Sequence, residues 1–99
     1  MRYLICENVV VHPNGAVINH SSVLRTFGNI GVARRYCMNN CRPGYSLNIL
    51  KETSEGLFSV GWVAYSSYGK HSKTAFAWIF HTSNGRKFIN KDGSLGRRV

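Results

Sequence analysis

Four short apolar segments separated by turn signals occupy the second half of the chain, and this pattern restricts the fold more than any other feature. The candidate strands cover residues 45–52, 57–66, 74–82 and 87–91. Residues 53–56 and the pair Asn84-Gly85 are typical of tight hairpin turns, and residues 66–73 form a longer loop. Successive strands joined in this way predict an antiparallel meander.

Ahead of the meander, the sequence predicts a hairpin. Residues 2–12 are rich in β-forming side chains, Pro13-Asn14-Gly15 turns the chain, and residues 16–18 return. Residues 23–28 then either open a helix at Ser22 or remain irregular. Glycine inside a helix costs about 1 kcal/mol, so the glycines at positions 28 and 31 argue against a helix that runs through both.

A helix that begins after Asn29 fits better. Asparagine is a favourable N-cap, and the chain breaks at Pro43-Gly44. Between these points, apolar or small residues recur at intervals of three and four and line one helix face. These residues are Ile30, Ala33, Cys37 and Cys41.

These elements predict an α+β fold in the order β-β-α-β-β-β-β. It consists of an antiparallel β-meander of about five to six strands with one main helix packed on it. At 99 residues, the chain is expected to form a single globular domain over residues 1–91. Residues 92–99 are rich in Gly, Ser and Arg, and we expect this basic tail to be frayed.

One helix is too small to cover both faces of such a sheet. A helix of about twelve residues is ~18 Å long and ~10 Å wide, so it covers two or three strands spaced ~4.8 Å apart. The strand at 57–66 is apolar on both sides, with one face predicted to carry Phe58, Val60, Trp62 and Ala64 and the other Leu57, Val63 and Tyr65. A half-barrel, the N-terminal hairpin, a second copy or a ligand could cover the second face. Of these, we expect curling or a homodimer contact.

The chain is strongly basic, with thirteen Lys and Arg residues against four acids and a net charge of +9. Such an excess favours a polyanionic partner, either nucleic acid or an acidic protein surface.

No apolar run approaches the ~20 residues that a membrane span needs, and Glu7 and Asn8 interrupt any signal-peptide core. We therefore expect a cytoplasmic protein with no membrane partner, whose three cysteines are reduced.

The basic residues are concentrated near the C-terminus. Seven of the thirteen lie beyond residue 69, where Asp92 is the only acid: Lys70, Lys73, Arg86, Lys87, Lys91, Arg97 and Arg98. Tyr68 and His71 could join the loop lysines in contacting phosphates. The helix arginines Arg34, Arg35 and Arg42 could form a second edge of the footprint. The 66–73 loop and the 84–87 turn lie ~30 Å apart along the intervening strand at ~3.3 Å per residue. They form one patch only if the tail wraps across.

The sequence argues against a metal site, a cofactor and most catalysis. Cys37 and Cys41 have helical spacing, and no second Cys or His pair completes a tetrahedral zinc site. The acids are scattered, and no phosphate-binding glycine loop is present. One enzymatic option remains, namely metal-free RNA cleavage. The residue types that it needs are supplied by Tyr68, Lys70, His71, His81 and Arg86.

Our leading hypothesis is a non-catalytic accessory protein that binds nucleic acid with weak sequence specificity. The alternative is a small inhibitor of the kind encoded by viruses or mobile elements, which docks on a host protein or nucleoprotein complex. A metal-free endoribonuclease is the second alternative. Direct binding to purified nucleic acid separates the first reading from the second.

Aromatic residues alternate along the strand at 74–82, where Phe76, Trp78 and Phe80 are predicted to share a face. Such a row either forms core or provides a platform for stacked bases. If it is core, Trp78→Ala should lower the free energy of unfolding by about 3–5 kcal/mol in urea denaturation. Unchanged stability with loss of nucleic-acid binding would instead support the stacking platform.

Overall fold

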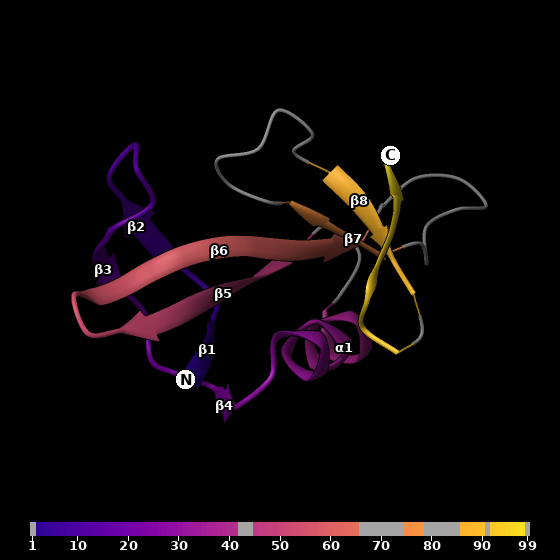
Figure 1. The fold of residues 1–99 in the computed structure, drawn as a ribbon, viewed down its shortest axis with the longest axis horizontal. Coiled ribbons are helices and arrows are strands. Elements are labelled where there is room, and N and C mark those ends of the chain that lie inside the picture. Colours follow the sequence, from indigo (N-terminus) through magenta and orange to yellow (C-terminus); the bar gives the residue numbers. More distant parts are fainter. Residues whose placement is uncertain (1, 42–44, 66–74, 79–85, 91, 99) are drawn as a thin grey trace.

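The computed structural model describes residues 2–41, 45–65, 75–78, 86–90 and 92–98. Within these ranges the chain forms one helix and nine strands (Figure 1). In chain order they are β1 (Arg2–Cys6), β2 (Val9–Val11), β3 (Val17–His20), β4 (Arg25–Phe27), α1 (Ile30–Asn40), β5 (Ser46–Thr53), β6 (Gly56–Tyr65), β7 (Ala75–Trp78), β8 (Arg86–Ile89) and β9 (Leu95–Arg98).

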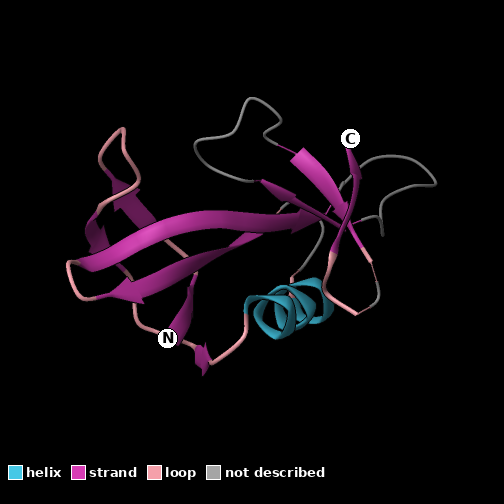
Figure 2. Cartoon of the chain, viewed as in Figure 1, coloured by secondary structure: helices cyan, strands magenta, loops and turns pink. Residues whose placement is uncertain are grey.

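Seven strands form one sheet in the order β4-β1-β5-β6-β7-β8-β9, and every neighbouring pair is antiparallel. Strands β5 to β9 follow one another in the chain, which is the predicted meander. The described helix packs on one side of this sheet (Figure 2). The predicted α+β fold is therefore confirmed.

The helix begins where the sequence predicts. Asn29 is the N-cap, with an extended backbone, and its side-chain oxygen accepts a hydrogen bond of 3.2 Å from the N–H of Val32. Ala33 and Cys37 are buried against the sheet, as their spacing requires. The helix ends at Asn40, and the N–H of Cys41 bonds to the carbonyl of Cys37 at 2.8 Å.

The N-terminal strands differ from the prediction in two respects. β1 does not continue into the hairpin, because the chain leaves the main sheet at Glu7 and Asn8, and β1 pairs with β5 instead. Residues 25–27, expected to be helical or irregular, form β4 on the outer edge of β1. This short strand satisfies backbone groups of β1, and the N–H of Leu24 extends the pairing to the carbonyl of Ile5 at 2.7 Å.

The main core lies between α1 and the sheet. Every third or fourth residue of the helix meets alternate residues of β1, β5 and β6. The buried members are Ala33, Cys37 and Cys41 from the helix segment and Ile5, Leu47, Ile49 and Val63 from the strands. This layer covers the middle of the sheet.

The other face is covered by the β2–β3 hairpin, which forms a separate two-stranded sheet. Val9 and Val17 of the hairpin pack against Leu4, Cys6 and Leu50 of the main sheet. The hairpin turn is tied to β6, because Ser59 N–H donates to the carbonyl of Gly15 at 2.8 Å and Ala16 bridges to Phe58. We expected curling or a homodimer contact here. Over β1, β5 and the first half of β6, the β2–β3 hairpin of the same chain covers this face instead.

A β-bulge in β6 overturns our assignment of its two faces. Ile49 pairs with Gly61 and Leu50 with Ser59, so Val60 is an extra residue. Gly61 has a φ of +135°, which glycine tolerates at a bulge. Val60 and Val63 consequently pack in the same core, whereas we had placed them on opposite faces.

The C-terminal segment is not a frayed tail. Residues 95–98 form β9, which pairs with β8 at the edge of the sheet. The connecting turn is closed by the N–H of Gly93 bonding to the carbonyl of Asn90 at 2.9 Å and by Asp92 accepting from the Ser94 N–H at 2.9 Å. Gly93 also packs against the first turn of α1, since a Cβ atom at this position would lie 2.7 Å from the carbonyl carbon of Gly31.

Gly93→Ala should destabilise the protein more than Gly56→Ala. Both glycines have positive φ angles, +88° and +120°, where alanine is strained by about 1–2 kcal/mol. Gly56 has no neighbour within 4 Å, whereas the new methyl group at Gly93 would overlap the Gly31 carbonyl. We expect urea denaturation to show a loss of about 3 kcal/mol or more for Gly93→Ala. Gly28→Ala, in open space without a positive φ, is the control; equal losses at 93 and 56 would contradict the helix contact.

All three cysteines are free thiols, and all are buried. Cys37 faces the core, as its position in the helix predicts. Burial is the main cause that raises the pKa of its thiol to about 12, with smaller contributions from Cys41 and Cys6. The folded protein therefore keeps this group protonated under conditions where the unfolded chain ionises it.

This difference makes stability fall at alkaline pH. The unfolded thiol has a pKa of about 8.5, so above that value the unfolded state binds fewer protons than the folded state and gains relative stability. Between about pH 9 and pH 11, the free energy of unfolding should fall up to about 1.4 kcal/mol per pH unit more steeply in the wild type than in Cys37→Ala. Urea denaturation across this range measures both slopes. Identical slopes would show that Cys37 ionises equally in the two states.

Candidate nucleic-acid interface

The last two strands bring four basic residues together. β8 carries Arg86 and Lys87, β9 carries Arg97 and Arg98, and Lys87 and Arg98 are Cα partners in the register of the two strands. Neighbouring strands lie ~4.8 Å apart, so two positive charges are anchored at directly opposed positions. β9 is the terminal strand in the order of the main sheet. We call these four residues the basic hairpin.

Arg35 on α1 adjoins the basic hairpin through the β8–β9 turn. Its Cβ would lie 3.3 Å from a Cβ placed on Gly93, and Arg35 is exposed. Asp92 in the same turn accepts a hydrogen bond of 2.6 Å from the Ser94 hydroxyl, which is the main cause that lowers its pKa, and the charge of Arg35 lowers it further. Asp92 is therefore ionised at neutral pH and offsets part of the local positive charge.

Arg34, its neighbour in the helix, has a different environment. Successive helix residues point about 100° apart, and Arg34 is half-buried on the side that interacts electrostatically with Tyr3 of β1. Burial lowers the pKa of Arg34, while Tyr3 raises it. Of Arg34 and Arg35, the structure brings Arg35 next to the turn between β8 and β9.

The remaining nominated residues lie outside the described residues: Arg42, Tyr68, Lys70, His71, Lys73 and Lys91. Whether the 66–73 loop joins the basic hairpin in one patch stays a prediction. The tail does turn back along the sheet, because β9 runs antiparallel to β8. That return places Arg97 and Arg98 beside the strand of Arg86 and Lys87.

Arg25 is not among the predicted site residues, and it lies on β4, at the opposite edge of the main sheet from the basic hairpin. It is exposed on β4, with its guanidinium carbon 6.0 Å from the centroid of the Tyr36 ring, and the Phe27 ring lies 5.3 Å from the same ring. The segment around Arg25 has neither strand alternation nor helical periodicity. Only the folded structure shows the contact: β4 pairs with β1, and the guanidinium of Arg25 then lies over the ring of Tyr36.

Two of the four acids lie far from the basic hairpin. Glu55 is in the β5–β6 turn, at the left end of Figure 1, whereas β8 and β9 lie towards the right. Glu52, near the same turn, accepts two hydrogen bonds from Arg2, at 2.7 and 3.0 Å. In a molecule 41 Å long, these two carboxylates therefore stand away from the basic hairpin, with Arg2 and Lys51 beside Glu52.

Within the described ranges, no three His, Cys, Asp or Glu side chains gather as metal ligands would. In the same part of the chain, no helix has the length and apolar character needed to cross a membrane. Comparison of the chain with protein-family models, curated proteins and solved structures finds no match.

Proposed function

We propose that this chain is a non-catalytic protein that binds nucleic acid through the basic hairpin. The observation that carries the proposal is the pairing of Lys87 with Arg98. Like charges at directly opposed positions destabilise a sheet, and cross-strand pairs are worth about 0.2–1 kcal/mol. A bound phosphate group removes this repulsion and gains charge-assisted hydrogen bonds. The pair therefore favours a bound polyanion.

The expected mode of binding is contact with the phosphate backbone. Lys and Arg contacts to phosphates fix the position of a protein on nucleic acid but carry no sequence information. Arg35 extends the surface from the sheet edge to the helix. Because successive strand residues alternate between the two faces of a sheet, the four cations of the basic hairpin lie on both sides of the sheet edge. Phosphate contacts at this edge and at Arg35, with Asp92 nearby, support weak sequence specificity and a strong dependence on salt.

The cations of β9 also fit a second role, for which the expected experimental result differs. Basic side chains on an edge strand also discourage sheets from pairing edge to edge. If that were their only role, replacing Arg97 and Arg98 would cause self-association and leave nucleic-acid affinity unchanged. Sedimentation of the variant alongside the binding assay distinguishes the two roles.

The salt dependence tests the proposal directly. If about five phosphates are neutralised, log K should fall against log salt with a slope near −4.5 on duplex DNA, between about 50 and 200 mM salt. Arg97→Gln with Arg98→Gln should make that slope shallower by about 1.8. Fluorescence anisotropy with labelled duplex and single-stranded oligonucleotides measures both.

The matched control is Arg25→Gln with Lys51→Gln, which removes the same charge from β4 and β5. Its slope should stay at the wild-type value, and all variants should keep their unfolding free energy within about 0.5 kcal/mol per substitution. Equal effects of the two pairs would show that net charge, not the hairpin, governs binding. Absence of binding at low salt would reject the proposal and favour the inhibitor reading. RNA cleavage in the presence of a chelator would instead favour the ribonuclease.

A further inference from the structure

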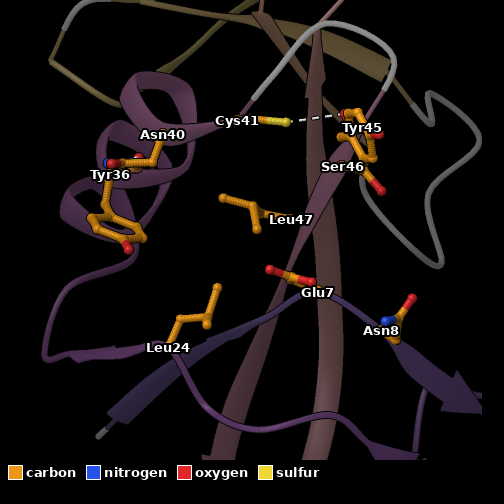
Figure 3. A pocket seen from close by; sticks show the side chains of 9 residues that line it. All are labelled: Glu7, Asn8, Leu24, Tyr36, Asn40, Cys41, Tyr45, Ser46 and Leu47. Carbon is orange, nitrogen blue, oxygen red and sulfur yellow. Dashed lines mark hydrogen bonds between the residues drawn. The ribbon is translucent and has the colours of Figure 1, made fainter.

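A second site lies away from the basic hairpin, where four segments of the chain line a half-open pocket of about 620 Å³ (Figure 3). The walls are the C-terminal half of α1, the start of β5, the link between β1 and β2 and the link between β3 and β4. Leu24 and Leu47 supply apolar surface, and Tyr36, Asn40 and Ser46 supply hydroxyl and amide groups. Sites for small molecules have volumes of about 300–1,000 Å³, and the walls of this pocket are more polar than is usual for them.

Among the described residues that line the pocket, Glu7 is the only one with a charged side chain. Figure 3 shows its carboxylate between Leu47 and Asn8, in the space that the lining residues surround. The structure records no hydrogen bond or ion pair from this carboxylate to any described residue. The other two carboxylates described above, Glu52 and Asp92, each have a partner. The pocket therefore holds a negative charge that the described part of the chain leaves unneutralised.

The backbone that carries Glu7 is held in place. The side-chain amide of Asn48, itself buried, donates to the carbonyl of Glu7 at 2.9 Å and to that of Cys6 at 3.4 Å. The next residue, Asn8, exchanges hydrogen bonds with Ser21: its N–H donates to the Ser21 hydroxyl at 3.0 Å, and its carbonyl accepts from the Ser21 N–H at 2.9 Å. These bonds fix the start of the side chain, which lowers the entropic cost of presenting the carboxylate to a ligand.

The end of α1 adds to the negative character of the pocket. Its C-terminal turn carries the partial negative charge of the helix dipole, and no basic residue stands in that turn. Asn40 holds its own orientation, since its amide nitrogen donates to the carbonyl of Tyr36 at 2.8 Å. Its side-chain oxygen is thus an available acceptor.

We infer that this pocket binds a small organic amine, with the ammonium group on the Glu7 carboxylate and the hydrocarbon part against Leu24 and Leu47. An ammonium group has three N–H donors. Glu7 can accept one or two of these hydrogen bonds, and the amide and hydroxyl oxygens of the pocket can accept the rest. Calcium and magnesium need several oxygen ligands, usually with more than one carboxylate. One carboxylate beside apolar surface matches a singly charged organic cation.

A titration with phenethylamine, followed by amide chemical shifts of the full chain, tests the inference. Saturable shifts are expected at Asn8, Asn40, Ser46 and Leu47. Its neutral isostere, 2-phenylethanol, should bind about tenfold more weakly, because a hydrogen bond to a charged group contributes about as much as a tenfold change in affinity. Glu7→Gln should lose the same factor for the amine and leave the affinity for the alcohol unchanged.

Glu55→Gln is the matched control, because it removes one carboxylate from the exposed β5–β6 turn. It should bind phenethylamine as the wild type does. Equal affinity for amine and alcohol, equal losses in the two variants, or shifts that never saturate would each overturn the inference. The dispersion of the amide spectrum shows whether each variant is folded. None of these measurements involves nucleic acid, so their outcome is independent of the basic hairpin.

Discussion

The fold depends on covering a sheet whose central strand is apolar on both sides. On β5, Leu47 and Ile49 meet α1, while Leu50 meets the β2–β3 hairpin. Each buried aliphatic side chain contributes about 1.5–3 kcal/mol, which a domain of this size cannot forgo on either face. The bond between Gly15 and Ser59 closes the hairpin onto the sheet. A helix on one side and a folded-over hairpin on the other give the middle of the sheet two cores.

The helix also positions both candidate sites. Its first turn, at Gly31, receives Gly93 of the β8–β9 turn so closely that no side chain fits at position 93. Its second half, from Tyr36 to Asn40, forms a wall of the Glu7 pocket. Packing of α1 therefore determines where the basic hairpin stands and what shape the pocket has, although neither site depends on the chemistry of the other.

Local signals were predictable, and signals that depend on distant pairing were not. Asn29 with its periodic followers defined the helix, and turn residues such as those at 53–56 defined the meander, since both act within a few residues. The bulge at Val60 was not predicted. One extra residue in a strand reverses the alternation of its side chains, so every later residue of β6 was assigned to the wrong face. β4 and β9 were missed because each is held as an edge strand by pairing with another strand, not by its own apolar pattern.

The basic residues could be nominated from composition, but the Lys87–Arg98 pairing required β9 to return along β8. The pocket was invisible, because Glu7 meets residues near positions 24, 36 and 47 only in the fold.

If the chain binds a polyanion as we propose, the positions of its charges affect how the two associate. A chain with net charge +9 is attracted to a polyanion from any direction at long range. Within about 8–10 Å, the Debye length at ordinary salt, only nearby charges count. An approach with the β5–β6 turn leading brings Glu55 and Glu52 to the phosphates together with Arg2 and Lys51, so the charges there largely cancel. An approach with the basic hairpin leading brings the opposed pair Lys87 and Arg98. If the chain binds a polyanion as we propose, its charge distribution therefore also favours the basic hairpin as the face of contact.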